Sequence, residues 1–305
     1  TLTACGEKKD DTSAAPGANS PAPSVAVDTA LAAKVPSAIK ADGKLLVGAD
    51  ATYAPSEFLD TDGKTIIGFD VDLFNAVAAK LGLKVDWQIS KFDDVIPGIM
   101  SGKYEVGVSS FTINADREKQ VQMVSYFNAG TQWVAKPGAT IDPENACGKK
   151  IAVQTGTVQD EDITAKSKKC TDAGKPAITI DHYQAQSDAT TAVVSGKDEA
   201  MLADSPVSAY AVKKTAGQLA LLGSIYDSAP YGYVVSNDQK ALAEALRDAT
   251  KALIADGSYK AILDRWGVVG GAITTESTVA FPQGRKTRNT PSAAKRSQGR
   301  RSKSA

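Results

Sequence analysis

Short apolar runs alternate with stretches of helical periodicity from Lys44 to Ala255, and this alternation limits the fold more than any other feature. Buried strands read as short continuous apolar runs, whereas surface helices repeat apolar residues every three or four positions. Strands that alternate with helices are typical of parallel strands in sheets covered by helices. The sequence therefore predicts an α/β fold with parallel-rich sheets.

The apolar runs and periodic stretches give the positions of the expected elements. The helical pattern that begins at Leu73 stops at Gly82, a typical helix-ending residue. No internal repeat divides the chain, whose 305 residues allow one large or two ordinary domains. The expected strands are 45–47, 85–89, 106–108, 151–153, 178–180 and 200–202, and the expected helices are 73–81, 95–100, 189–194, 207–212 and 242–255.

The first residues, Thr1-Leu2-Thr3-Ala4-Cys5, resemble a bacterial lipobox, in which the cysteine becomes the lipid-bearing first residue. Residues 7–36 are rich in Ala, Pro, Ser, Asp and Lys without apolar periodicity, so we interpret 1–36 as a lipobox and flexible tether. One acyl chain binds membranes only marginally, so stable anchoring through Cys5 implies more than one, palmitate among them. We expect an extracytoplasmic protein anchored to the cell membrane by lipid.

Charge is distributed unevenly, although the chain carries 35 basic and 35 acidic residues. Eight basic and no acidic residues lie between Arg285 and Lys303, which leaves 27 basic and 35 acidic residues elsewhere, a net charge of −8. An acidic body is not typical of nucleic-acid binding, so no nucleic-acid partner is expected. Residues 272–305 are predicted to be a disordered basic tail; solvation is favoured over contact with anionic lipid or nucleic acid.

Cys147 and Cys170 bracket a short segment and are expected to form a disulfide, with two free thiols as the alternative. Closing a loop of this size is worth about 3 kcal/mol in the chain-entropy model. Cytosolic proteins rarely keep such a bond, so a disulfide agrees with the extracytoplasmic location.

Residues for catalysis, phosphate or metal binding are sparse. His182 is the single histidine and has no nucleophile motif nearby, which favours a surface or loop role over a catalytic one. The sequence contains neither of the glycine-rich phosphate-binding motifs G-x-x-x-x-G-K-[ST] and G-x-G-x-x-G. Asp60 and Asp62 look like half a calcium loop without its later ligands, so a turn is favoured, and no metal or cofactor is expected. A hydrolase with two carboxylates stays open, although the paired carboxylates stand where helices begin: Asp70, Asp72, Asp93 and Asp94.

Gly68-Phe69-Asp70-Val71-Asp72-Leu73 resembles the G-F-D-x-D-L signature of the polar amino-acid family, family 3, of ABC-transporter solute-binding proteins. The resemblance covers about Val35 to Gly271, and the joint order of its motifs is specific although each motif alone is weak. The other motifs are Asp50-Ala51-Thr52-Tyr53-Ala54-Pro55, Phe92 with Ile96-Pro97, Ser110 to Arg117, Gln154-Thr155-Gly156-Thr157, Asp204, Tyr231-Gly232, and Gly257-Ser258-Tyr259 before Trp266-Gly267.

The resemblance implies a type II periplasmic-binding-protein fold, with two α/β lobes joined by two crossing strands near 127–131 and 227–231. The first lobe would contain 37–127 and 231–271, and the second lobe 128–230. A monomer of this kind would close its cleft on a free amino acid and present it to the permease of an ABC importer.

The resemblance also implies the ligand-binding residues, and the chemistry of an amino acid agrees with them. Arg117 would hold the α-carboxylate with two hydrogen bonds, and Asp204 would accept from the α-ammonium; the simpler roles are a surface arginine and a helix cap. Three kinds of residue belong to the set, namely polar groups near the carboxylate, walls around the side chain and the residue at its distal end: Ser110, Thr112 and Thr157; Tyr53 and Phe92; and Asp50. Gln154, from the motif Gln154-Thr155-Gly156-Thr157, completes the set.

Departures from the family pattern bear on the ligand. Relatives that bind glutamine often carry Lys where Gln154 stands and His where Ala203 stands, which puts glutamine in doubt. Because Asp50 has no nearby lysine to pair with, it favours a bound amino acid with a cationic side chain, such as arginine, lysine or ornithine. This preference is stronger if Glu57 also faces the cleft. A cyclohexadienyl or arogenate dehydratase-like enzyme on the same scaffold is the alternative, although a non-enzyme is favoured.

Overall fold

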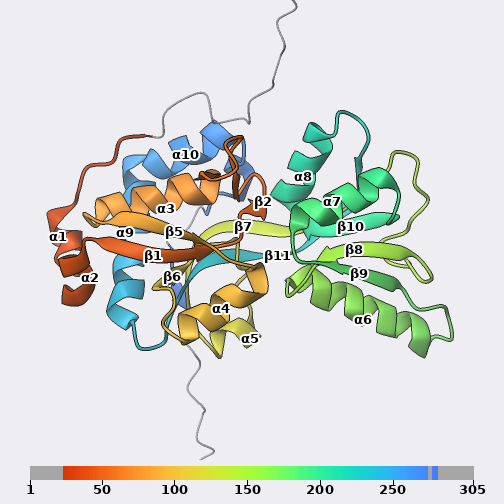
Figure 1. Cartoon of the computed structure of the whole chain (residues 1–305), viewed down its shortest axis with the longest axis horizontal. Coiled ribbons are helices and arrows are strands. Elements are labelled where there is room, and N and C mark those ends of the chain that lie inside the picture. The colour runs from red at the N-terminus through yellow and green to blue at the C-terminus, as the bar shows by residue number, and fades with distance from the viewer. Residues whose placement is uncertain (1–22, 274–276, 281–305) are drawn as a thin grey trace, which may run out of the picture.

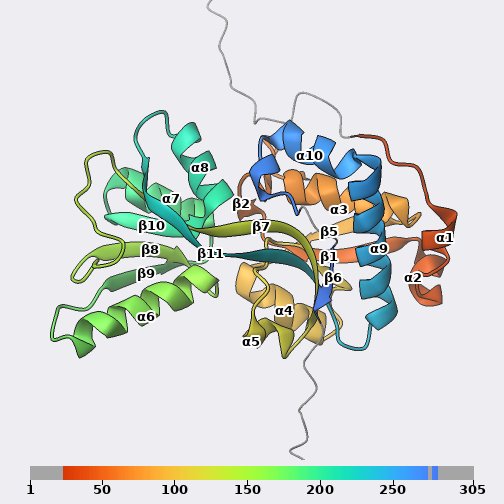
Figure 2. The same ribbon diagram turned by 180° about the vertical axis from the view of Figure 1, so that it is seen from behind.

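The computed structural model describes residues 23–273 and 277–280. Cys5 and the basic residues from Arg285 to Lys303 lie outside this part of the chain, so the predicted lipobox and most of the predicted tail are not described. Two lobes lie side by side in Figures 1 and 2, and two long strands, β7 (Gln122–Ala135) and β11 (Ala220–Val235), run from one to the other.

One mixed sheet passes through both lobes in the order β5-β1-β6-β11-β7-β10-β8-β9. In each lobe three strands are parallel, as predicted, while β7 and β11 pair antiparallel with each other and with the neighbouring strands β10 and β6. The parallel strands are β1 (Lys44–Ala49), β5 (Lys84–Ile89) and β6 (Val106–Gly107) in the first lobe, and β8 (Lys150–Gln154), β9 (Thr179–Tyr183) and β10 (Ala200–Asp204) in the second.

Helices cover both faces of the sheet, and a small antiparallel sheet adjoins the first lobe. The small sheet contains β2 (Thr52–Tyr53), β3 (Glu57–Leu59) and β4 (Ile66–Ile67). The helices of the first lobe are α1 (Thr29–Ala32), α2 (Ser37–Asp42), α3 (Phe69–Lys80), α4 (Phe92–Met100), α5 (Ala115–Glu118), α9 (Lys240–Asp256) and α10 (Ser258–Trp266), followed by the 3-10 turn η1 (Val269–Gly271). Those of the second lobe are α6 (Val158–Asp172), α7 (Gln186–Ser195) and α8 (Ser205–Lys214).

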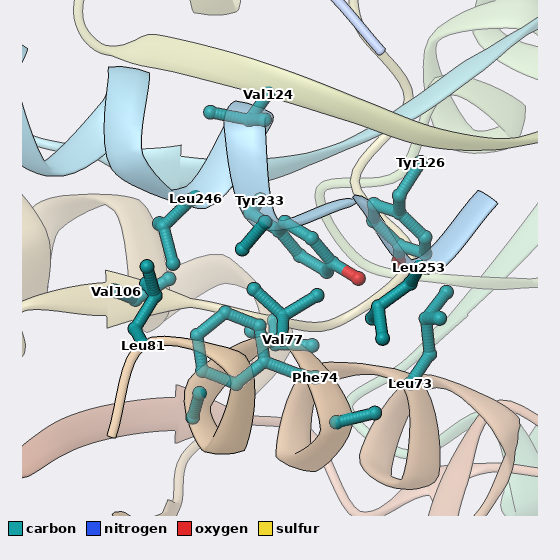
Figure 3. Packing of buried hydrophobic residues seen from close by; sticks show 14 of the residues in the cluster. Leu73, Phe74, Val77, Leu81, Val106, Val124, Tyr126, Tyr233, Leu246 and Leu253 are labelled. Atoms are coloured by element: carbon teal, nitrogen blue, oxygen red, sulfur yellow. The ribbon is translucent and has the colours of Figure 1, made fainter. Parts of the chain in front are cut away.

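Alternation along β7 builds the cores on its two faces, because successive side chains of a strand point to opposite sides. Val124 and Tyr126 pack with α3 and α9 in the core shown in Figure 3, whereas Met123 faces the opposite core beside α4. Further along, Trp133 packs with α6 and Val134 with α7 and α8. The same strand therefore fixes helices on both faces of both lobes.

Every predicted strand and helix is found within a few residues of its expected position. The predicted crossings fall inside β7 and β11; the residue boundaries 127/128 and 230/231 stay predictions. The disulfide between Cys147 and Cys170 is confirmed and joins the loop before β8 to the end of α6. No helix in the described ranges is long and apolar enough to cross a bilayer.

Two predicted flexible segments are partly wrong. Residues 23–36 were expected in the tether, but α1 forms there and Val35 is buried, since Val25, Leu31 and Val35 supply apolar contacts to the core of the first lobe. At the other end, residues 277–280 were expected in the tail. Ser277 is buried, and the strand β12 (Val279–Ala280) pairs with β7.

Candidate functional site

The site lies where the carboxyl ends of the parallel strands of the two lobes face each other. Asp50 follows β1, and Gln154 and Asp204 end β8 and β10. Ligands of open α/β sheets bind outside the carboxyl ends of strands, where loops can present polar groups. The order of strands thus brings side chains from distant parts of the sequence to one place.

A small cavity of about 10 Å³ is enclosed there, about the room one water molecule needs. Residues from both lobes line it: Tyr53, Phe92, Ser110, Thr112 and Arg117 from the first, and Thr157, Val158, Gln159 and Asp204 from the second. Seven of the nine predicted site residues are in this set, while Asp50 and Gln154 pair with each other elsewhere in the interface between the lobes.

Arg117 enters the cavity from α5, whose first turn is capped by the Asn114 side chain. Its guanidinium donates to the Thr112 carbonyl at 2.8 Å and, across the cleft, to the Gly156 carbonyl at 3.3 Å. Its central carbon lies 5.5 Å from the ring centres of Phe92 and Phe111. Burial lowers the pKa of Arg117, although Glu161 and Asp204 oppose the shift. Because no carboxylate is hydrogen-bonded to it among the described residues, the guanidinium can receive an anion.

Asp204 faces Arg117 from the second lobe and is almost fully buried. The Tyr53 hydroxyl donates to its Oδ2 at 2.8 Å, and the Gln159 amide donates to its Oδ1 at 2.9 Å. Burial raises the pKa of Asp204, while Tyr53, Gln159 and the Arg117 charge act against that shift. Although Asp204 is the N-cap of α8, its side chain makes no capping bond, so the carboxylate is turned to the cavity.

Asp50 is buried beside the cavity and accepts a hydrogen bond from the Gln154 side-chain amide across the cleft. Burial raises the pKa of Asp50 to about 6, against the effect of the hydrogen bonds it accepts. Gln154 also donates to the Gln184 carbonyl at 3.0 Å. An acid at this position, with an amide as its only hydrogen-bonded side chain across the cleft in the described residues, favours a cationic group.

The polar residues expected at the carboxylate have other contacts as well. Ser110 donates its backbone N–H to Asp70 at 3.1 Å, so that group is already bonded within the first lobe. Thr112 supplies the carbonyl that holds Arg117. Thr157 caps α6, because its hydroxyl accepts from the Asp160 N–H at 3.1 Å. Thr157 is therefore the N-cap of α6 as well as part of the cavity wall.

Sequence reasoning missed Gln159, which lies in the first turn of α6 and bridges Asp204 and Thr131. Its position two residues after Thr157 is the signal that could have found it. Glu57 was expected to favour a cationic ligand only if it faced the cleft. It is fully buried and not part of the cavity wall, and it accepts from Ser109 at 2.8 Å.

Hydrogen bonds join the lobes across the cleft, so the structure is a closed form. They connect Tyr53 with Asp204, Arg117 with Gly156, Asp50 with Gln154, and Thr52 with Gln186.

Comparison with known proteins shows the family and the fold. The model of bacterial extracellular solute-binding proteins, family 3, matches residues 45–269. The arginine-binding protein ArgT of Corynebacterium glutamicum is 36% identical over 244 residues, 79% of this chain and 80% of that protein.

Solved structures agree with this match. An ancestral arginine-binding protein bound to arginine is 33% identical, with a TM-score of 0.69 over 73% of this chain and 98% of the other. The ancestral amino acid-binding protein AncCDT-1, a precursor of cyclohexadienyl dehydratase, is 30% identical, with a TM-score of 0.68 over 75% of this chain and 97% of the other. The predicted type II periplasmic-binding-protein fold is thereby confirmed.

Proposed function

Because this chain belongs to family 3 of the bacterial extracellular solute-binding proteins, we propose that it captures a free basic amino acid between its lobes and delivers it to an ABC importer. Arginine is the first candidate ligand, since relatives such as ArgT are named as arginine-binding proteins. The observation that carries the proposal is the placement of Arg117 and Asp204, opposite charges from different lobes, on the wall of one cavity.

In the proposed complex, Arg117 holds the α-carboxylate and Asp204 accepts from the α-ammonium. The stacked rings of Phe92 and Phe111, with centroids 4.6 Å apart, hold the guanidinium of Arg117 from one side. The N-terminus of α6 adds free N–H groups and the positive end of a helix dipole near Thr157. Each charged end of the ligand is thus met by a group of opposite sign.

The side chain of the ligand would extend along Tyr53 and Phe92 towards Asp50. A guanidinium or ammonium there would replace Gln154 as the partner of Asp50, or share it with Gln154. A buried carboxylate favours a cation because an unpaired charge is costly in a site of low polarity. This supports arginine, lysine or ornithine over neutral amino acids.

Closure would couple binding to transport. A ligand that contacts both lobes favours the closed form by its difference in affinity for the two forms. The importer would then recognise the closed monomer. An extracytoplasmic location follows from the family, agrees with the disulfide, and includes, in our proposal, a lipid anchor at Cys5.

A thermal-shift screen of the twenty amino acids, ornithine and citrulline tests the proposal. A ligand at a hundred times its dissociation constant should stabilise the protein by about 2.7 kcal/mol. Basic amino acids should give the largest shifts. If none of the compounds changes the unfolding temperature, the proposed function is wrong.

Two observations support a second candidate, the dehydratase-like enzyme. The chain is similar to a precursor of cyclohexadienyl dehydratase, and burial raises the pKa of Asp204, as a general acid in the cavity would need. Incubation with prephenate or arogenate separates the two functions, since an enzyme would release product and a binding protein would not.

A further inference from the structure

Two buried carboxyls meet directly behind the ligand cavity. Glu57 begins β3 and Asp70 lies in the first turn of α3, and neither is exposed to solvent. Gly68 makes this approach feasible, because a Cβ atom there would lie 1.9 Å from the Ser56 carbonyl oxygen. Its φ of 142° is also a conformation that side chains disfavour. The glycine of the G-F-D motif thus brings the start of α3 against the small sheet.

The segment that lines the cavity is hydrogen-bonded to both acids. Ser109 donates its hydroxyl to Glu57 Oε1 at 2.8 Å. The Ser110 hydroxyl lies 3.2 Å from Asp70 Oδ2 and 3.4 Å from Glu57 Oε2, and the Ser110 N–H donates to Asp70 Oδ2 at 3.1 Å. The Tyr126 hydroxyl donates to the same Asp70 oxygen. One oxygen of Asp70 therefore receives several hydrogen bonds.

The surroundings of the pair contain acids and phenols, and no salt bridge to either carboxyl exists among residues 23–273 and 277–280. Glu57 interacts electrostatically with Asp50, which follows β1, and with Tyr53 from β2. Asp70 interacts with three tyrosines: Tyr126 from β7, Tyr233 from β11 and Tyr259 from α10. Figure 3 shows Tyr126 and Tyr233 beside each other in this core, with stacked rings. Burial raises the pKa of Glu57, with Asp70 as the second cause, and burial raises the pKa of Asp70.

Two adjacent buried carboxyls without a cation cannot both be ionised, so they share a proton. The Ser110 hydroxyl lies within 3.4 Å of an oxygen of each carboxyl, which places the two side chains next to each other. Because Asp70 is the second cause that raises the pKa of Glu57, Glu57 is favoured as the side chain that carries the proton and Asp70 as its acceptor. Oδ1 of Asp70 is buried and accepts no hydrogen bond from any other described group, so it is available for the Glu57 proton. The negative charge then rests on Asp70, which accepts from Ser110 and Tyr126.

The pair also determines the backbone of the binding segment. Ser110 has a φ of 49°, a left-handed conformation that costs energy for a residue with a side chain. Its N–H bond to Asp70 holds it there, and the chain continues to Thr112, whose carbonyl orients Arg117. Ser109 meanwhile accepts from the Asp50 N–H at 3.0 Å. The acids are thereby linked to both ends of the proposed ligand site.

We propose that Glu57 and Asp70 are positioning residues, a pair of carboxyls with one shared proton that fixes the Ser109–Thr112 segment in the form that binds the amino acid. This inference rests on the proposed function, but the shared proton can be measured without any ligand.

Infrared spectroscopy tests the proton. The ligand-free protein at pH 7 should show the carbonyl band of a protonated buried carboxyl, and Glu57→Gln should lose that band, because the amide replaces the protonated acid. Asp50→Asn is the control and should keep it. Identical spectra of wild type and Glu57→Gln overturn the pair even if an amino acid binds; conversely, a protein that shows the band but binds no amino acid would contradict only the proposed function.

Calorimetry with arginine tests the positioning. Glu57→Gln keeps an N–H donor towards Asp70, so its affinity should stay within about threefold of wild type. Asp70→Asn holds Ser110 through a neutral oxygen, and hydrogen bonds to a charged acceptor are roughly twice as strong, so affinity should fall about tenfold or more. Asp72→Asn, from the same turn of α3, should bind like wild type. A folded Asp70→Asn protein with wild-type affinity, or a Glu57→Gln protein weakened as much as Asp70→Asn, overturns the positioning role.

Discussion

Arg117 is the residue whose loss should weaken ligand binding most. Arg117→Ala would leave the α-carboxylate of the ligand desolvated without its partner, which costs about 2–5 kcal/mol when a buried charge pair is truncated. Isothermal titration with arginine measures this loss. Arg247→Ala removes a partly exposed arginine that pairs with Asp248 in α9 and should bind normally. Wild-type affinity of Arg117→Ala would remove the assignment.

Asp50 should make the binding of a cationic ligand dependent on pH. Burial raises its pKa to about 6 in the folded protein, and the cation binds the ionised form. Affinity should therefore be constant well above pH 6 and fall below it, by up to about tenfold per pH unit, with proton release on binding. Calorimetry in buffers of different ionisation enthalpy measures the protons. Asp50→Asn should bind more weakly and without this dependence; an unchanged pH profile would contradict the role.

At the residue scale, the sequence predicted the side chains that belong to motifs and missed those that act through a neighbour. Arg117, Asp204 and Tyr53 follow from motif order. Gln159 does not, because its contact with Asp204 depends on how α6 approaches β10. Glu57 was recognised only as a possible cleft residue, since its burial behind Ser109 results from the packing of β3 against α3.

At the scale of elements, β12 should contribute to stability although it has two residues. It pairs with Val124 and Met123 of β7, and Ser277 donates its hydroxyl to the Ser125 carbonyl at 2.6 Å. A chain that ends at Ile273 should unfold at lower temperature than a chain that ends at Ala280, by a few degrees for each kcal/mol lost. Differential scanning calorimetry compares the two; equal unfolding temperatures would show that the strand is dispensable.

The disulfide should stabilise the second lobe through the entropy of the unfolded chain. Cys147 and Cys170 are separated by 23 positions, and the double variant Cys147→Ala, Cys170→Ala should lose about 3 kcal/mol. Urea unfolding of the variant, beside wild type with and without reductant, measures this loss. A midpoint that neither mutation nor reduction changes would contradict it.

Long periodic elements could be predicted from the sequence, and short ones that rest on tertiary contacts could not. The helix α9 carries its apolar pattern over several turns and was found, whereas α1 has four residues, none of them buried. The strand β12 has no pattern of its own because pairing with β7 produces it. The low apolar content of the segments that contain α1 and β12 predicts flexibility, although a few apolar contacts suffice to hold both segments.

For the whole molecule, the balance between open and closed lobes should depend on Tyr53. Its hydroxyl donates to the Asp204 carboxylate and accepts from the Asp204 N–H, so two bonds join the lobes here. Losing a hydrogen bond to a charged group costs about 1.5–3 kcal/mol. Tyr53→Phe should therefore raise the open fraction of the ligand-free protein, as measured by distances between spin labels on α2 and α6. Tyr183→Phe, which loses a bond to Asp198 inside the second lobe, is the matched control. Equal distance distributions for both variants would show that the Tyr53 hydroxyl does not stabilise the closed form.

The path of the chain through the sheet has a consequence for biosynthesis. Strand β6 pairs with β11, and α9 packs on α3, so the first lobe is completed by residues made after the second. A nascent chain emerges N-terminus first. The core around β1, β5 and β6 therefore stays incomplete until β11 and α9 are made, whereas β8, β9 and β10 pair with strands that are made before β11. Transiently exposed apolar surface favours aggregation. The N-terminal lobe is therefore the part on which a chaperone would act for longest.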